Sequence, residues 1–481
     1  MVELTNTDMT TTNATTSAVD LRRIEVPGAV EIYQLSTPGL GDHSYLVRSG
    51  LEVAVIDPQR DLDRYRAAVA ELGGKLALVA ETHVHNDYVS GGRALASEYG
   101  AIHVLPAQAG YAFGHHPVAD GEEVPFGTAR LRAVHTPGHT PHHTAFMVLE
   151  GDEVLAVLSG GCVLVGACGR TDLVAPGLTE ELTRAQYRSA HRLGELPQPT
   201  AIGPTHGQGS FCAASATGTE TWTTVAKEKL RNPAFTTADE GDFLARQLAG
   251  LAAYPAYYAR MAGVNLAGAP GWDPHPIPSV SPEDLARLQG DGAVVIDGRP
   301  RRQAAAGHVP ASVNVELAPF FGTYLGWLFP AGTRFVLVLG HGQDTTDAAR
   351  QAARVGIESI EGVLGGGVDA WVASGRPLRS YPVTDIDGLK TALDAGRARV
   401  LDVRQDQEWT GGHLAGATHI HIPELRARVD EIGPGDPVHV LCQTGHRAAM
   451  GASILDAAGV PAVLVDGGVP DWASKGHPLA S

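Results

Sequence analysis

The sequence predicts an α/β protein with an N-terminal αββα sandwich followed by two α/β domains with parallel sheets. The chain has 481 residues, more than one ordinary domain holds. Its N-terminal half alternates short β-rich runs with loops full of His, Gly and Asp, whereas its C-terminal half repeats one strand–turn–helix pattern. We expect a disordered tail at 1–20 and domains at 21–267, 278–378 and 383–481.

Six β-rich runs predict the two sheets of the first domain: VEIYQL, LEVAVID, LALVAE, RLRAVH, TAFMVLE and DEVLAVLS. A helical pattern, DRYRAAVAEL, follows the second run, and residues 236–265 are mostly helical with a break at Pro255. Helices on both sides of paired sheets give the αββα arrangement. The Thr-, Asn- and Ser-rich start of the chain predicts the disordered tail.

The C-terminal half contains an internal repeat. The matching residues, with the first copy named first, are Asp297 and Asp402, Arg299 and Arg404, His308 and His413, Trp371 and Trp472, and Pro377 and Pro478. Each copy spans about a hundred residues, which is a usual domain size. The order of strand, turn, helix and strand in each copy predicts a parallel sheet covered by helices.

The composition excludes several kinds of partner. The formal net charge of −17 disfavours nucleic acid and anionic membranes, and no apolar run is long enough to span a bilayer. The first 20 residues have neither a basic start nor an apolar stretch, so we expect no secretory signal. The four cysteines form no disulfide framework, which favours a reducing cytoplasm. A homo-oligomer is compatible with this composition.

Cys442 lies where the apolar run VHVL ends and a helix begins near Arg447. The loop between them consists of Gln443, Thr444, Gly445 and His446. Backbone N–H groups and the positive end of the helix dipole stabilise a thiolate at such a turn, and Arg447 adds positive charge. We therefore expect Cys442 to act as a nucleophile that attacks a sulfur donor and holds a persulfide. The alternative is a buried structural cysteine.

This loop, the Asp402-Val403-Arg404 segment and the Gly467-Gly468 to Trp472 tail resemble the rhodanese (sulfurtransferase) family over residues 383–481. The resemblance implies that Cys442 carries the sulfane sulfur and that residues 443–447 cradle it. The first copy departs from this pattern, because Gly340 falls at the position of Cys442 and Thr345 at that of Arg447. We expect the first copy to form no persulfide and to pack between the other domains or shape a substrate channel.

Four segments with His, Cys or Asp residues occupy loops of the first domain: THVHNDYVS, HTPGHTPHH, LSGGCVLVGACGRTDL and GPTHGQGSFC. They resemble the metallo-β-lactamase fold superfamily, in its persulfide dioxygenase and glyoxalase II-like branch. The resemblance implies metal binding by His83, His85 and His139, with Asp87 and His206 as further ligands.

Two positions depart from the family pattern: Tyr88 replaces a histidine, and Gly161 replaces an aspartate. The remaining three imidazoles can bind Fe(II) or, alternatively, Zn(II). The other reading is a domain without metal. Asp57 is a candidate for orienting a ligand histidine or for capping a turn.

Other residues near these segments have open roles. Arg170 is a candidate for binding a substrate carboxylate or for an ion pair with Asp172. Cys212 is a candidate for relaying sulfur to a substrate or for filling space in the core. We expect His142 and His143 to face solvent.

These observations favour an enzyme of sulfur metabolism that acts on small thiols and persulfides, thiosulfate or sulfite. In the first hypothesis, a persulfide similar to glutathione persulfide is oxidised to sulfite at a mononuclear metal, and Cys442 transfers sulfane sulfur. The alternatives are a rhodanese-type sulfurtransferase with a metal-poor N-terminal scaffold, a glyoxalase II-type thioester hydrolase, and a non-catalytic sulfur carrier or sensor.

Overall fold

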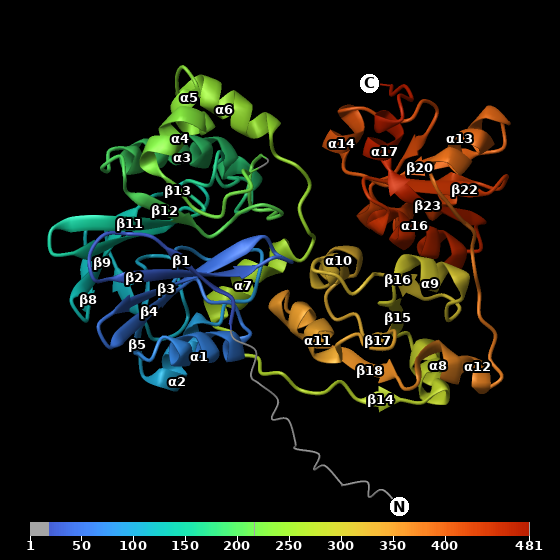
Figure 1. The fold of residues 1–481 in the computed structure, drawn as a ribbon, viewed down its shortest axis with the longest axis horizontal. Helices are drawn as coiled ribbons and strands as arrows, with labels where there is room; N and C mark the ends of the chain where they lie inside the picture. The colour runs from blue at the N-terminus through green and yellow to red at the C-terminus, as the bar shows by residue number, and fades with distance from the viewer. Residues whose placement is uncertain (1–18, 216, 481) are drawn as a thin grey trace, which may run out of the picture.

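The computed structural model describes residues 19–215 and 217–480, and its elements fall into three groups (Figure 1). Most of the predicted tail, residues 1–18, lies outside the described residues. The predicted α/β class is confirmed, with an αββα sandwich followed by two domains with parallel sheets. In the described part of the chain, no helix or strand crosses 268–278 or 379–382.

Seven strands form the first sheet of the sandwich in sequential order. They are β1 (Leu21–Ile24), β2 (Glu31–Thr37), β3 (Asp42–Ser49), β4 (Glu52–Ile56), β5 (Lys75–Ala80), β6 (Ile102–Pro106) and β7 (His116–Val118). The first four strands pair antiparallel and the rest parallel. Helices α1 (Leu62–Glu71) and α2 (Gly92–Tyr99) connect the parallel strands, as crossovers must.

Six strands form the second sheet in the order β13-β12-β11-β10-β9-β8. They are β8 (Glu123–Phe126), β9 (Ala129–His135), β10 (Thr144–Glu150), β11 (Glu153–Gly160), β12 (Ala201–Pro204) and β13 (Thr223–Thr224). The helices of this half are η1 (Pro176–Leu178), α3 (Thr179–Gly194), α4 (Val225–Arg231), α5 (Pro233–Thr236), α6 (Glu240–Ala249) and α7 (Tyr258–Ala267). One apolar cluster joins the facing surfaces of the two sheets, with Ile32 and Tyr45 from one and Phe146 and Leu158 from the other.

The first repeat domain (residues 278–378) has a five-stranded parallel sheet in the order β14-β18-β17-β15-β16. Its strands are β14 (Ser279–Val280), β15 (Val294–Asp297), β16 (Val313–Asn314), β17 (Phe335–Val338) and β18 (Ile360–Leu364). Its helices are α8 (Pro282–Gly290), α9 (Arg301–Ala306), α10 (Phe321–Leu328), α11 (Thr345–Arg354) and α12 (Gly367–Ala373).

The second repeat domain (residues 383–481, described to 480) repeats this topology in the order β19-β23-β22-β20-β21. Its strands are β19 (Val383–Thr384), β20 (Arg399–Asp402), β21 (Thr418–His419), β22 (Val438–Cys442) and β23 (Ala462–Gly468). Its helices are α13 (Ile386–Asp394), α14 (Asp406–Thr410), η2 (Ile422–Glu424), α15 (Leu425–Arg428), η3 (Val429–Ile432), α16 (His446–Ala457) and α17 (Val469–Ser474).

The matching Asp and Arg residues of the repeat form the same buried ion pair in both domains. Arg299 contacts Asp297, and Arg404 contacts Asp402, in each case two residues after the strand ends. The guanidinium then donates to a glycine carbonyl, Gly307 in one domain and Gly412 in the other. The repeated residues therefore fix the turn after the strand rather than forming a site.

The first repeat domain lies below the second in Figure 1, with the sandwich to the left, and it contacts both. It shares a continuous apolar cluster with the second repeat domain, in which Phe321 and Leu325 of α10 pack with Ile422 and Leu425. Its opposite side contacts the sandwich through α10 and α11. There the Thr323 hydroxyl donates to the Gly39 carbonyl at 3.2 Å.

Asp61 of the sandwich is a buried carboxylate held by arginines from both sides of that interface. Arg354 contacts it at 2.6 Å and Arg350 at 3.4 Å from the first repeat domain, and Arg64 at 3.5 Å from its own domain. Burial alone would raise the pKa of Asp61, but these guanidinium groups hold it well below its usual range. The stability of this interface therefore depends on the negative charge of Asp61, because removing one partner of a buried ion pair leaves the other charge unpaired.

We predict that Asp61→Asn lowers the free energy of unfolding by about 3–5 kcal/mol, because the arginines lose their buried partner. Urea denaturation measures the change. The stabilisation is present above the pKa of an unfolded aspartate, about 3.9, and is lost as the pH falls further, because the folded pKa is the lower one. Asp63→Asn, at a more exposed partner of Arg350, serves as the control with an expected cost of about 0–1 kcal/mol. Equal effects of the two variants would contradict the prediction.

Candidate functional site

Four histidines predicted as ligands meet between the two sheets of the sandwich. His83 and His85 follow β5, His139 follows β9 and His206 follows β12. All four are buried, none more than 1% exposed. Loops at the ends of neighbouring strands place residues far apart in sequence at one edge of a sheet. The structure therefore brings together His83, His85, His139 and His206.

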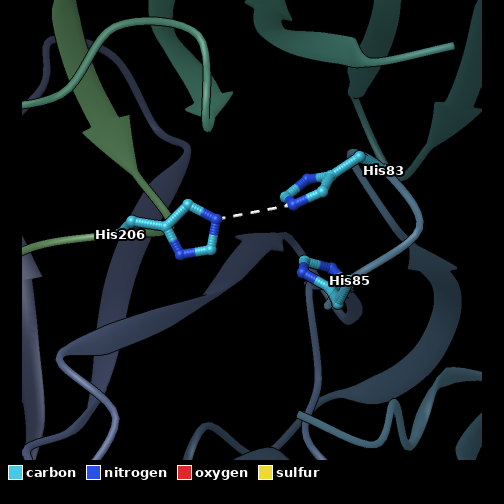
Figure 2. A group of neighbouring side chains, drawn as sticks. All are labelled: His83, His85 and His206. Atoms are coloured by element: carbon cyan, nitrogen blue, oxygen red, sulfur yellow. Dashed lines mark hydrogen bonds between the residues drawn. The ribbon is translucent and has the colours of Figure 1, made fainter. Parts of the chain in front are cut away.

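The rings of His83 and His206 face one another across the cluster, and His85 lies beside them (Figure 2). The Nε2 atoms of His83 and His206 are 3.4 Å apart. The Nδ1 of His139 donates to the Arg170 carbonyl at 2.6 Å, which leaves its Nε2 buried without a hydrogen-bond partner. The Nδ1 of His85 is also buried without a partner. A buried imidazole nitrogen without a hydrogen-bond partner is suited to bind a metal ion.

Two carboxylates flank His206 on the side away from His83. The Nδ1 of His206 lies 2.9 Å from Asp42 and 3.2 Å from Asp87. Burial disfavours the imidazolium, but these carboxylates outweigh burial and raise the pKa of His206 to about 10. Burial raises the pKa of Asp42 well above its usual range, helped by Asp87, whereas His206 holds the pKa of Asp87 below its usual range despite burial.

His85 has a carboxylate partner of its own, Asp57. The Nε2 of His85 lies 3.2 Å from Asp57, whose carboxylate also accepts from the backbone and hydroxyl of Thr82 and from the Thr205 hydroxyl. Burial would lower the pKa of His85, but Asp57 raises it. Asp57 adopts a φ of +54°, a strained backbone for a residue other than glycine. It therefore orients a histidine rather than merely capping a turn.

The remaining two cluster histidines are neutral at physiological pH. Burial lowers the pKa of His139 to about 3, and burial with the neighbouring histidines lowers that of His83 well below its usual value. Neutral imidazoles offer a lone pair to a metal. Three groups of side chains place one donor atom each within 4.8 Å of one another: His83, His85 and His206; His139, His206 and Cys212; and Asp42, Asp87 and His206. The residues present therefore fit a metal ion, and His206 belongs to all three groups.

Tyr88 occupies the position of the replaced family histidine and is fully buried. Its ring stacks on His85 with centroids 4.4 Å apart, and its hydroxyl lies 3.1 Å from the His85 Nε2. That nitrogen is the one bound to Asp57, so Tyr88 contacts the side of His85 opposite the orphaned Nδ1. Tyr88 thus helps to hold the His85 ring in place.

Gly161 occupies the position of the replaced family aspartate, and the ring of His139 fills the space beside it. A Cβ on Gly161 would overlap the Cδ2 of His139 and lie 2.6 Å from its Cγ. The backbone of Gly161 does not require glycine, since its φ is not positive. The close contact with His139 therefore explains the glycine, and a carboxylate at this position is incompatible with the observed ring.

Arg170, Cys212 and His143 are all buried beside the cluster. Arg170 makes the ion pair with Asp172, at 2.8 Å, and donates to the carbonyls of Phe211 and Ala252. The Cys212 thiol lies 3.8 Å from the Tyr258 hydroxyl. His143 does not face solvent as expected. It accepts from the Gly161 N–H at 2.9 Å and is fully buried, because it fills the space under the 160–161 turn.

Cys442 is the last residue of β22 and is buried, 1% exposed. The N–H of Gly445 donates to its sulfur at 3.1 Å. Gly445 adopts a φ of +93°, a conformation that favours glycine, and α16 begins at the next residue. The loop 443–447 thus curls around the sulfur at a helix N-terminus, where backbone N–H groups stabilise an anion.

Arg447 does not point a free charge at Cys442, because it forms a two-point ion pair with Glu408 at 2.5 and 2.7 Å. Glu408 is a site residue that the sequence analysis missed. The internal repeat does hold a signal for Glu408. In the first copy, Gln303 stands at the position of Glu408, and Thr345 stands at that of Arg447. The first copy therefore lacks both members of the Glu408–Arg447 ion pair.

A cavity of about 380 Å³ lies over the Cys442 loop, and both repeat domains line it. The first repeat domain supplies Glu316, Ala318, Pro319, Phe320, Phe321 and Tyr324, and the second supplies Gln443, Thr444, His446, Arg447 and Met450. Arg301 of the first repeat domain donates to the Thr444 carbonyl at 2.7 Å and contacts Glu316 at 3.1 Å. Sequence reasoning missed Arg301, Glu316 and Tyr324, since nothing in their local sequence marks them.

The corresponding loop of the first repeat domain lines a cavity of its own, of about 490 Å³. Gln343 accepts from the Gly340 N–H at 2.7 Å and donates to the Gly298 carbonyl at 2.8 Å. Gly340 and Thr345 stand in this loop where the second repeat domain has Cys442 and Arg447.

Comparisons with known proteins agree with this three-part layout. Residues 38–206 match the metallo-beta-lactamase superfamily, and residues 281–374 and 385–475 each match the rhodanese-like domain. "Persulfide dioxygenase ETHE1, mitochondrial" of Bos taurus is 31% identical over 216 residues, which cover 44% of this chain and 78% of that protein.

Two further matches extend the comparison. A hydroxyacylglutathione hydrolase of Gloeobacter violaceus is 33% identical over 158 residues, 32% of this chain and 58% of that protein. A crystal structure of a metallo-beta-lactamase from Staphylococcus aureus subsp. aureus COL aligns with a TM-score of 0.63 at 26% identity, covering 70% of this chain and 99% of that one.

We predict that Gly161→Asp lowers the free energy of unfolding by about 1–3 kcal/mol, because the new side chain overlaps His139. Urea denaturation measures this, and combining it with His139→Ala should recover part of the loss, since removing the ring removes the clash. Gly177→Asp is the control, because a side chain there meets open space. Additive losses in the double variant would contradict the assignment.

Proposed function

The chain belongs to the metallo-beta-lactamase superfamily, in its ETHE1 and glyoxalase II-like branch, and carries two rhodanese-like domains. From this premise we propose that the protein transfers sulfane sulfur through Cys442. The carrying observation is the Gly445 N–H that donates to the Cys442 sulfur at the N-terminus of α16. The coarser assignment, to sulfur metabolism, follows from the relatives and the two rhodanese-like domains.

In the proposed step, the Cys442 thiolate attacks the outer sulfur of a persulfide, RSS⁻. A bond forms between the Cys442 sulfur and the outer sulfur of the donor, and the sulfur–sulfur bond of the donor breaks. The products are the Cys442 persulfide anion and the thiolate RS⁻, with the same total charge as the reactants. With thiosulfate as donor, sulfite is the group released. The product anion stays in the loop 443–447, where N–H groups at the start of α16 stabilise it.

The first repeat domain contributes to this site although it has no nucleophile. Arg301 holds the Thr444 carbonyl, and Tyr324 and Phe320 form an apolar wall of the cavity. A mostly apolar wall with a few polar groups suits a small organic thiol or persulfide. We therefore assign the first repeat domain the role of shaping the substrate pocket of the second.

A second function is supported in the sandwich domain, namely oxidation of a low-molecular-weight persulfide to sulfite by dioxygen at a mononuclear metal. The supporting observations are the orphaned nitrogens of His85 and His139 and the ETHE1 relative. When bound, Fe(II) would supply the redox chemistry of this oxidation. Asp57 and the Arg170 carbonyl orient His85 and His139 for that role.

Thioester hydrolysis of the glyoxalase II type has weaker support. A bridged two-metal site needs a second full set of ligands. The Tyr88 hydroxyl contacts the His85 ring and does not point to the centre of the cluster. The ring of His139 fills the space that a carboxylate side chain at position 161 would need.

We place the protein in a reducing cytoplasm, which fits four buried cysteines that are all free. Among residues 19–215 and 217–480, no helix is both long and apolar enough to cross a membrane.

We predict that Cys442→Ser lowers thiosulfate and glutathione persulfide sulfurtransferase activity by at least about 1,000-fold, because it removes the nucleophile. Mass spectrometry of the wild-type protein after exposure to donor should show one added sulfur atom on the peptide that contains Cys442. Cys168→Ala, at a buried cysteine near Asn232, is the matched control and should keep its activity. Full activity in Cys442→Ser would refute the proposal.

We predict that Arg301→Gln lowers kcat/KM for sulfur transfer about tenfold, because the loop loses one charged hydrogen bond worth about 1.5 kcal/mol. The persulfide on Cys442 should still form, but more slowly, since Arg301 positions the loop without supplying the nucleophile. Arg302→Gln changes a neighbouring arginine that is 71% exposed and contacts Asp466, so its rate should stay at the wild-type value. If both variants behave alike, Arg301 has no special part in the site.

A further inference from the structure

Cys212 lies against the histidine cluster. It is not one of the residues that the family resemblance names as metal ligands. Its sulfur and one nitrogen each of His139 and His206 lie within 4.8 Å of one another, and all three side chains are fully buried. Donors that share one tetrahedral metal ion at 2.0–2.3 Å lie about 3.3–3.8 Å apart. Small side-chain movements bring these three atoms into that range.

Arg170 fixes both His139 and Cys212 through its backbone. Its carbonyl accepts from the His139 Nδ1 at 2.6 Å, and its N–H donates to the Cys212 carbonyl at 2.8 Å. Its guanidinium is anchored to Asp172 and two carbonyls and stacks on Tyr254. A single rigid residue thus sets the separation of two donors, which gives Arg170 a positioning role in place of the predicted contact with substrate.

The two histidines each present one ring nitrogen to the cluster, where the Nε2 of His206 lies 3.4 Å from that of His83, and the Cys212 thiol lies 3.8 Å from the Tyr258 hydroxyl. The Nε2 of His139 is buried without a hydrogen bond. His206 has its Nδ1 against Asp42 and Asp87, which directs its Nε2 to the cluster. A ligand histidine is usually held in this way by its second nitrogen.

We propose that His139, His206 and Cys212 bind a divalent transition-metal ion, with the Cys212 thiolate as the anionic donor in a site where Gly161 offers none. The group of His83, His85 and His206 offers imidazoles alone, and the carboxylates of the third group, Asp42 and Asp87, lie at the Nδ1 of His206. A buried divalent cation favours an anionic ligand. Imidazole and thiolate together suit Zn(II) and Fe(II).

Three protein ligands leave one coordination position open, as in sites that admit a substrate. On the premise of the proposed function, this position would accept the sulfur of a small thiol or persulfide. The metal assignment itself stands on the geometry of the three donors and does not depend on sulfur transfer at Cys442.

The test uses the full chain carrying Cys442→Ser, so that the cluster is examined without the second reactive sulfur. Loaded with Co(II), this protein should show the near-ultraviolet charge-transfer band of a sulfur–cobalt bond. Loaded with Zn(II), it should show one sulfur at about 2.3 Å by X-ray absorption. Adding Cys212→Ser should remove both signals, whereas adding Cys162→Ala, which changes a buried cysteine in a separate apolar cluster, should leave both.

Stoichiometric metal with nitrogen and oxygen donors only would overturn the proposal, as would a sulfur signal that survives Cys212→Ser or a failure to bind Co(II) and Zn(II). The Cys442→Ser spectrum decides the question even if Cys212→Ser does not fold. Sulfur transfer is assayed separately on the wild-type protein. Its absence beside an intact metal–sulfur signal would refute the proposed function and leave the metal site standing.

Discussion

The hydrogen bond from the Gly445 N–H to the Cys442 sulfur fixes the geometry on which the C-terminal site depends. Glycine is required at that position for two reasons. Its φ of +93° is costly for other residues, and a side chain there would overlap the guanidinium of Arg301. The same residue therefore turns the loop around the sulfur and lets the neighbouring domain reach it.

The first repeat domain lacks the residue types of the Cys442 loop and contacts the candidate sites of both neighbouring domains. Gly340 replaces the nucleophile, and Gln303 and Thr345 stand where the second domain has the Glu408–Arg447 pair. On one side, its Tyr324 and Arg301 complete the pocket over Cys442. On the other, Trp327 packs on Phe211, one residue before Cys212, with ring centroids 4.9 Å apart. Helix α10 thus contacts the surroundings of both sites.

The fold and the strand–loop–helix setting of Cys442 could be predicted from sequence, because both depend on local patterns. Apolar runs of four to eight residues marked the strands, and the repeat marked two domains of one topology. Cys442 lies in a single strand–loop–helix segment, so its neighbours in sequence are its neighbours in space.

The rest of the sites depends on contacts between distant segments. Asp42 meets His206 across 164 residues, and Arg301 meets Thr444 across 143. The reason for Gly161 is the ring of His139, which no local pattern reveals. His206 was the less certain ligand from sequence, yet it belongs to every candidate metal group in the structure.

A structure of the full chain after exposure to glutathione persulfide tests sulfur transfer at Cys442 most directly. The expected result is one additional sulfur atom bonded to the Cys442 sulfur, enclosed by the loop 443–447 and facing the cavity beneath Tyr324. An unmodified Cys442 in protein that has taken up sulfane sulfur elsewhere would contradict it.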